Sequence, residues 1–220
     1  MDLYDVMRTT PAVREFTADP LPDEILHRIL DHARFAPSGG NRQGVRIIVV
    51  RDQRTRERLA ELNKPAVRRY VAQIKAGQSP WNSLEPPIPT PDEIEATDVP
   101  ESFTKPVLTA GAVLVVCVDL GVVASTDQLL DRVGVISGAS VYPMVWNVLL
   151  AARNEGFGGT ITTMAAAEEP AVRALLGIPD EYAVAAVLPI GKPVKQLTRL
   201  RRNEVEEFVT RETFDGAPFA

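Results

Sequence analysis

The stretch that decides how this chain is interpreted is Ala36-Pro37-Ser38-Gly39-Gly40-Asn41-Arg42-Gln43-Gly44. It separates a helical pattern that ends near Phe35 from an apolar run that begins at Val45. Pro37 cannot continue a helix, and the glycine pair allows backbone conformations that other residues rarely adopt. Ser38, Asn41 and Gln43 place hydroxyl and amide groups where the helix ends and the strand begins. This concentration of hydrogen-bonding side chains indicates a loop that binds a polar ligand. A helix stop followed by an ordinary polar loop gives a similar pattern, so this stretch alone leaves both interpretations open.

The composition is that of one ordinary globular domain. With 220 residues, 45% of them hydrophobic, the chain can bury a sizeable core. No apolar run approaches the roughly 18 residues of a membrane-spanning helix. The first residues carry no export signal, and the single cysteine, Cys117, lies inside an apolar run, which favours a reducing cytoplasm. The formal net charge of −5 argues against nucleic acid as a partner.

One basic cluster departs from this acidic average. Its members are Lys192, Lys195, Arg199, Arg201 and Arg202. Charge concentrated in this way suggests a site for a small anion, whereas a solvated tail segment is the plainer interpretation. A nucleic-acid patch is a third and weaker one.

Interleaved periodicities predict an α+β domain. Helices are expected at 3–8, 22–35, 53–78, 125–133, 138–153, 168–176 and 205–209, and strands at 45–50, 112–119, 161–163 and 182–190. We expect strand 45–50 to be buried on both faces, and Pro65 and Pro143 to interrupt or kink their helices. The glycine-rich fingerprints of the common nucleotide-binding folds are absent from the sequence.

The region 79–106 contains seven prolines and reads as a long connection without secondary structure. Such connections are usually functional lids or disordered segments. Trp81 and Phe103 near its ends favour a lid that docks on an apolar surface, and disorder is the alternative.

Four separated pieces of the chain suggest one shared ligand. They are the arginines Arg8 and Arg14, the loop 38–43, the turn 158–160 and the basic tail. Arginine pairs with phosphate oxygens, amides both donate and accept hydrogen bonds, and glycine lets backbone approach a planar ring. Flavin mononucleotide (FMN) has the phosphate, the polyhydroxyl linker and the planar head that would satisfy all four.

The chain resembles the FMN-dependent nitroreductase family along nearly its whole length. The matching motifs are 13–16 with 20–22, Ala-Pro-Ser-x-x-Asn-x-Gln at 36–43, the helix 140–153, Gly-Phe-Gly-Gly at 156–159 and Gly-Lys-Pro at 191–193. The resemblance implies an α+β fold over 1–220, with a central mixed sheet flanked by helices, and an intertwined homodimer with FMN at its interface. It also implies ping-pong hydride transfer from NAD(P)H to a nitroaromatic or a quinone. Within this single domain, 79–106 would be a lid or excursion and 192–220 a C-terminal extension.

The resemblance also implies the residues that bind the cofactor. They are Arg8, Thr9, Thr10, Arg14, Pro37, Ser38, Gly39, Asn41, Gln43, Pro143, Met144, Gly158, Gly159, Arg199 and Arg201. Among them the arginines would hold the phosphate, with Arg202 as a further candidate, and the two glycines would present backbone to the reactive edge of the flavin. No catalytic side chain and no metal ligand are implied, because the cofactor carries the electrons.

Three departures from the family pattern leave details open. Arg8-Thr9-Thr10-Pro11-Ala12 replaces the usual Arg-Arg-Ser, Gly44-Val45 replaces Pro-Trp, and 64–106 is longer than in a minimal member. The acceptor and the choice between NADH and NADPH are therefore not determined. The alternatives are a flavin-binding or sensing protein without efficient turnover, and another reaction on the same fold: flavin fragmentation, reductive dehalogenation or enoyl-type reduction.

Overall fold

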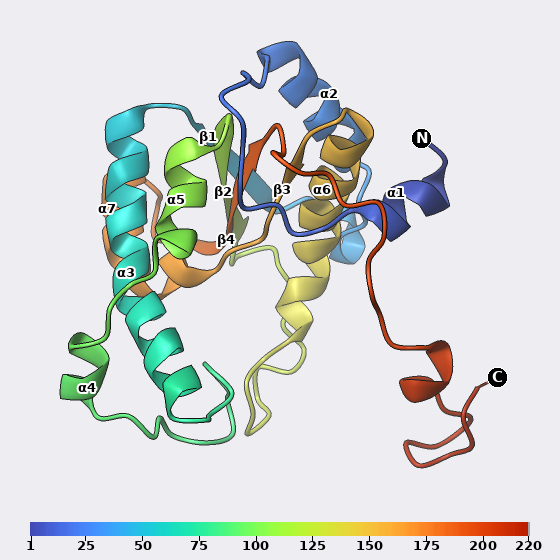
Figure 1. The fold of residues 1–220 in the computed structure, drawn as a ribbon. Coiled ribbons are helices and arrows are strands. Elements are labelled where there is room, and N and C mark those ends of the chain that lie inside the picture. The colour runs from blue at the N-terminus through green and yellow to red at the C-terminus, as the bar shows by residue number, and fades with distance from the viewer. Residues whose placement is uncertain (220) are drawn as a thin grey trace.

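The fold is organised around a four-stranded sheet with the strand order β1-β2-β4-β3 (Figure 1). The computed structural model describes residues 1–219. The strands are β1 (Val45–Val50), β2 (Ala112–Asp119), β3 (Gly158–Gly159) and β4 (Tyr182–Gly191). All the paired strands run antiparallel, and β2 against β4 shifts register between Val116 and Cys117.

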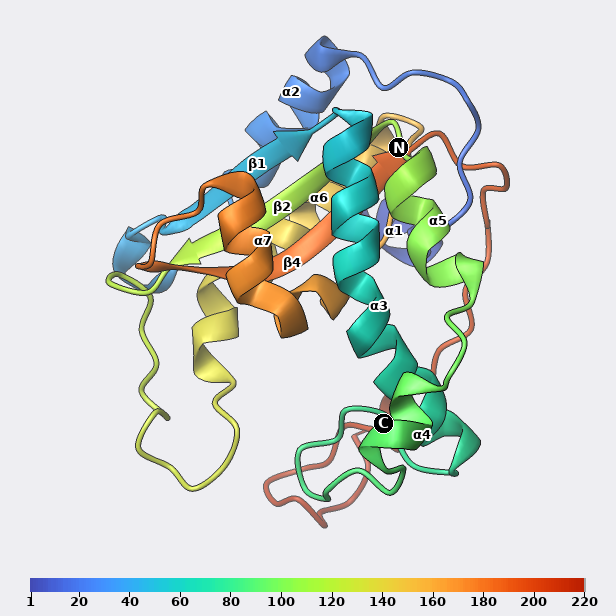
Figure 2. The ribbon, with the colours of Figure 1, turned by 90° about the vertical axis from the view of Figure 1, so that its left-hand side faces the viewer.

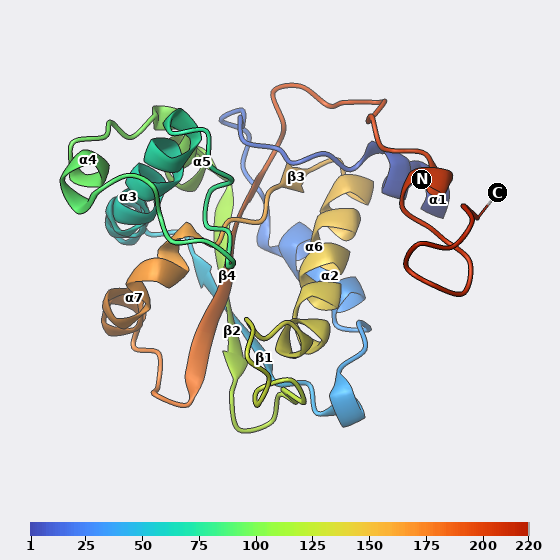
Figure 3. The ribbon, with the colours of Figure 1, turned by 90° about the horizontal axis from the view of Figure 1, so that it is seen from below.

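Helices cover both faces of this sheet. The helices are α1 (Leu3–Thr9), α2 (Asp23–Ala33), α3 (Gln53–Lys75), α4 (Pro91–Glu95), α5 (Glu101–Thr109), α6 (Tyr142–Asn154) and α7 (Glu169–Leu176). Helices α3, α5 and α7 lie in front of the sheet in Figure 2, and Figure 3 shows the sheet edge-on between this layer and the layer of α2 and α6. The predicted α+β class and the central sheet with flanking helices are confirmed. Within residues 1–219, parallel pairing is limited to one isolated bridge between Ala12 and Gly159.

The core consists of two hydrophobic clusters that share the central strand β2. Leu114 and Val116 face α2 and α6, while Val113 and Val115 face α3, α5 and α7. Because alternate side chains of a strand point to opposite faces, a strand with both faces covered must be apolar throughout, as β2 is.

Strand β1 is less buried than its sequence predicts. It lies at the edge of the sheet and pairs only with β2 among the described strands. Arg46 is exposed, and 42% of the surface of Val49 is accessible. The prediction that β1 is buried on both faces is therefore wrong for the single chain.

The two prolines that were expected to disturb helices do not do so. Helix α3 runs unbroken through Pro65, which is exposed, while the turns on either side are anchored by buried residues such as Leu59 and Val67. Pro143 occupies the first turn of α6, where no intrahelical partner is needed for a backbone N–H. A short 3-10 helix, Ile136–Ser140, precedes α6 where a continuous helix was expected.

Three other segments also differ from expectation. The region 79–106 contains α4 and the start of α5, and α4 opens with a capping box between Thr90 and Glu93. The segment 125–133 forms turns, because the carboxylate of Asp127 accepts hydrogen bonds from Arg132 and from the Val135 N–H, which competes with helix formation. The third strand is Gly158–Gly159, and Thr162 adds only an isolated bridge to Val187.

The remaining elements lie where they were expected. Gly177, with a φ of 64°, caps α7 in the left-handed conformation. After Gly191 the chain first pairs with segment 15–17, and beyond Leu197 it leaves the body as an extended arm that carries the 3-10 turn Val205–Glu207 (Figure 1). Within residues 1–219, no helix is both long and apolar enough to cross a membrane.

Candidate functional site

Two adjoining hollows form a groove beside the segment that follows α1. The larger, about 510 Å³, is lined by 11–15, by Ser102 and Lys105 of α5, and by Lys195. The smaller, about 160 Å³, shares Arg14 and Ser102 and continues along 160–164. We call the two together the Arg14 groove.

The backbone pairing of segment 12–17 explains why Arg14 faces this groove. The Val13 N–H donates to the Gly159 carbonyl at 2.8 Å, and the Val194 N–H donates to the Glu15 carbonyl at 3.1 Å. The segment is thus held between β3 and the chain that follows β4. Val13 points into the core, so its neighbour Arg14 points outward.

The charges of the Arg14 groove are not neutralised by ion pairs. Arg14, Lys105 and Lys195 all line it, and within residues 1–219 none of them lies in a salt bridge. Two carboxylates, Glu15 and Glu101, also line the larger hollow. Unpaired cations in a concave surface favour an anionic ligand.

The wall of the smaller hollow combines apolar rings with hydroxyl groups. Tyr70 of α3 and Phe103 of α5 meet edge to face, with ring centroids 5.5 Å apart. Thr160, Thr162 and Thr163 lie across from α3 and α5 on the chain after β3. Such a surface suits a flat ring with polar edges.

The predicted glycines do not themselves line the groove. Gly158 and Gly159 are buried, and a Cβ at Gly159 would lie 2.6 Å from the Pro189 carbonyl oxygen. At Gly158 it would lie 2.7 Å from the Val13 side chain. Their lack of a side chain allows β3 to pack, and the residues that follow them, 160–164, line the groove.

Thr9 and Thr10 direct their hydroxyls back into α1. The Thr9 Oγ1 donates to the Asp5 carbonyl and the Thr10 Oγ1 to the Val6 carbonyl, both at 2.6 Å. The Thr9 carbonyl in turn accepts hydrogen bonds from Arg153 and Gln196. These threonines therefore join α1 to its neighbours.

The loop 36–44 forms a separate, exposed site. The Gln43 N–H donates to the Ser38 Oγ, and the Gly39 N–H donates to the Ser140 Oγ, each at 3.0 Å. Asn41 and Gln43 have φ values of 52° and 51°, a conformation that costs energy for residues with a side chain. Because Ser140 lies two residues before the start of α6, the loop lies against the beginning of α6.

The predicted residues Pro143 and Met144 lie at that beginning, in the first turn of α6. Figure 3 shows α1 and the start of β1 at opposite sides of the molecule. The loop 36–44 and the Arg14 groove are therefore far apart within one chain.

The predicted arginines of the tail do not reach the Arg14 groove either. Arg199 and Arg201 line a hollow within the arm, together with Arg202. Arg8 is exposed on α1, 6.0 Å from the centroid of the Tyr4 ring. Of the predicted arginines, the structure brings Arg14 alone to the groove.

Sequence reasoning missed Ser102 and Lys105 and gave Lys195 no role of its own. Ser102 and Lys105 fell within 79–106, where the prolines suggested a connection rather than the start of a helix. Lys195 was part of the basic cluster, but sequence alone did not distinguish it from the arginines that follow. Cys117 is buried, and burial raises the pKa of its thiol to about 11, so it is a core residue and not a nucleophile.

Comparison with known proteins adds independent information. Residues 7–192 match the model of the nitroreductase family. An iodotyrosine deiodinase of Thermotoga neapolitana is 25% identical, over 92% of this chain and 95% of its own. An NADH dehydrogenase of Thermus thermophilus is 28% identical, over 84% of this chain and 83% of its own. An iodotyrosine deiodinase structure with FMN and 3-iodo-L-tyrosine superposes with a TM-score of 0.69 at 24% identity, covering 97% of this chain and 100% of its own.

Proposed function

The chain belongs to the nitroreductase family, and we propose that it is an FMN-dependent oxidoreductase that passes hydride from NAD(P)H to a nitroaromatic or a quinone. The observation that carries this proposal is the Arg14 groove, with three unpaired cations around a hollow of about 510 Å³. That volume lies within the range of small-molecule sites, roughly 300–1,000 Å³.

The groove supplies groups that fit a flavin. Arg14 and Lys105 offer positive charge, which stabilises a ring that becomes anionic on reduction. Ser102 and Thr160–Thr163 offer hydroxyls or backbone groups to the polar ring edges, and Tyr70 and Phe103 offer apolar surface. When bound, FMN would supply the hydride chemistry, and the protein's part is to orient it and to limit the access of water.

We propose that the working unit is a homodimer. The loop 36–44 and the first turn of α6 lie too far from the groove of their own chain to share a ligand with it. A second copy would bring Pro37, Ser38, Asn41 and Gln43 to that groove. The first half of α6 exposes Tyr142 and Trp146, an apolar surface that a partner would cover.

The region 79–106 contributes to the groove as part of one domain that spans the chain. Its C-terminal end supplies Ser102 and Phe103 to the wall. Trp81 donates its backbone N–H to the Gln73 side chain and its ring N–H to the Ala66 carbonyl, which ties the excursion to α3. We interpret region 79–106 as an ordered segment that forms part of the wall of the site. We also propose that the protein is located in a reducing cytoplasm.

Reductive dehalogenation is a second candidate. The deiodinase relative matches nearly the whole chain, and the deiodinase structure has FMN in this fold. A halogenated phenol would need the same flavin and the same groove. A flavin-binding protein without turnover would use them too, so only acceptor assays separate the three.

The decisive experiment begins with the visible spectrum of the purified protein and the mass of any released cofactor. NADH and NADPH are then added without oxygen, followed by nitrobenzene, 1,4-benzoquinone or 3-iodotyrosine. Bleaching of the flavin by a nicotinamide and its recovery with nitrobenzene or the quinone supports the first proposal. Recovery with 3-iodotyrosine alone supports dehalogenation, and bleaching without recovery supports a binder. A protein that takes up no FMN contradicts all three.

A matched pair of lysine variants tests the groove itself. Lys105→Met removes a groove cation, and we expect FMN affinity to fall roughly tenfold or more, because hydrogen bonds to charged groups contribute about 1.5–3 kcal/mol. Lys75→Met removes an exposed lysine at the end of α3 and should leave affinity unchanged. Equal affinities in the two variants would contradict the assignment of Lys105.

A further inference from the structure

Of the four arginines that were expected to hold the phosphate of the proposed cofactor, the structure brings only Arg14 to the groove. The family's Arg-Arg-Ser is replaced by Arg8-Thr9-Thr10-Pro11-Ala12, and the Thr10 hydroxyl is already hydrogen-bonded to the Val6 carbonyl of α1. Arg8 lies over Tyr4, and Arg199 and Arg201 lie along the arm. The phosphate therefore needs a cation from another element.

Arg153, in the last turn of α6, has two guanidinium nitrogens available. Its Nε donates to the carbonyl and to the hydroxyl of Thr9, each at 3.1 Å, and its side chain is only partly exposed. Within residues 1–219, the two terminal nitrogens make no hydrogen bond or ion pair. The Nε contacts hold the guanidinium in place and leave its outer edge free.

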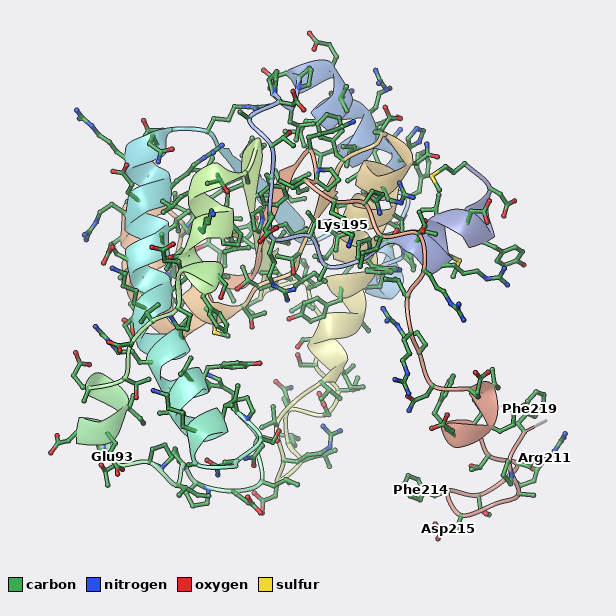
Figure 4. All side chains as sticks on the ribbon, in the orientation of Figure 1. Glu93, Lys195, Arg211, Phe214, Asp215 and Phe219 are labelled. Carbon is green, nitrogen blue, oxygen red and sulfur yellow. The ribbon has the colours of Figure 1, made fainter. Side chains whose placement is uncertain are left out.

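Arg153 contacts Thr9, which lies two residues before Pro11, a residue that lines the larger hollow. The Arg153 Nε and the Gln196 Nε2 both donate to the Thr9 carbonyl oxygen at 3.1 Å. The distance between these two nitrogens is therefore at most twice that value. Gln196 stands between Lys195 and Leu197, which both line the larger hollow along with Pro11. Figure 4 shows Lys195 in the body of the molecule, far from the end of the arm.

We propose that Arg153 binds the phosphate of the flavin together with Lys195. This inference rests on the proposed function and adds a residue from a helix to which the family pattern assigns no phosphate contact. A guanidinium presents parallel N–H groups that match two phosphate oxygens, and Lys195 adds a second positive charge. Arg14 and Lys105 then remain for the ring.

The test compares FMN with riboflavin, which has the same ring and ribityl chain but no phosphate. Both flavins are titrated into cofactor-free protein, and binding is measured by quenching of flavin fluorescence. The wild-type protein should bind FMN more tightly than riboflavin. Arg153→Gln should weaken FMN binding roughly 10- to 100-fold and change riboflavin binding less than about twofold. Arg153→Lys, which keeps the charge without the paired N–H groups, should fall between the two.

A second variant separates phosphate binding from the anchoring of Thr9. Gln196→Leu removes the other donor to the Thr9 carbonyl but no charge, so it should leave the ratio of the two affinities unchanged. An equal loss of FMN and riboflavin in Arg153→Gln would mean that Arg153 only holds α1 against α6, and no loss would remove it from the site; either result overturns the inference. Equal binding of both flavins by the wild type overturns it too. A wild type that binds neither flavin overturns the proposed function itself.

Discussion

The Arg14 groove and the loop 36–44 differ in how the backbone holds their polar side chains. Around Arg14 the backbone is paired on both sides, by Gly159 and by the chain after β4, so the side chains face the groove from a fixed frame. In the loop, Asn41 and Gln43 adopt left-handed backbone and stay exposed. A strained, exposed arrangement persists when it serves an interaction outside its own segment. The comparison supports the proposal that each of these two regions, which lie far apart within one chain, supplies half of a shared site.

The largest expected effect is on FMN binding, in dimers that combine a chain with a damaged groove and a chain with a damaged loop. A groove variant, Arg14→Glu with Lys105→Glu, and a loop variant, Asn41→Asp with Gln43→Glu, should each lose FMN affinity by roughly 100-fold, because both place negative charge beside an anionic ligand. Mixed dimers of the two should regain one site of normal affinity, since one of their two sites combines an intact groove with an intact loop. The flavin bound per purified mixed dimer measures this.

Two outcomes of that experiment would contradict the proposal that the groove of one chain and the loop of the other form one site. Mixed dimers that bind no flavin would place the whole site within one chain. Two flavins per mixed dimer would mean that neither variant damages binding. Wild-type protein carrying the same purification tags is the control for assembly.

A smaller effect is expected on stability when a glycine of each region is replaced by alanine. Gly159→Ala puts a Cβ 2.6 Å from a backbone oxygen that cannot move away, and we expect the free energy of unfolding to fall by roughly 1–3 kcal/mol. Gly39→Ala puts a Cβ 3.4 Å from the Ser140 Oγ, an ordinary contact, and should change stability by less than about 0.5 kcal/mol. Urea unfolding of both variants measures the difference, and equal stabilities would show that the groove frame is no more rigid than the loop.

The smallest effect is a gain in stability. Gln43→Gly removes a side chain from a residue with a φ of 51°, so the flavin-free protein should become more stable by about 0.5–1 kcal/mol. The same change should weaken FMN binding, because the amide is lost. Thermal unfolding with and without FMN measures both, and a loss of stability without flavin would show that the conformation of Gln43 is not strained.

Patterns that repeat along the sequence were enough to predict most of the fold. The apolar runs of β2 and β4 and the apolar faces of α2 and α6 follow from local periodicity. The position of β1 at the edge of the sheet does not, because its branched residues would suit a central strand equally well. Pro65 and Pro143 were misjudged because the effect of a proline depends on where the helix begins and on what packs around it.

The candidate site was harder to predict because it depends on tertiary contacts. Arg14 belonged to a motif and could be identified. Lys105 could not, since its proline-rich surroundings concealed the start of α5, and Lys195 reaches the groove only because the segment after β4 pairs with Glu15. Arg153 gave no signal, since an arginine in the last turn of a helix is common for electrostatic reasons alone.

Strand β1 ends the sheet with a row of peptide groups that no other described strand pairs. Such a row is a template for any extended chain, and an exposed Arg46 in its middle is the kind of charge that discourages wrong neighbours. For the homodimer proposed above, separated chains would thus be the form most prone to aggregate. Variants that weaken the proposed assembly should be lost to precipitation before they lose their fold.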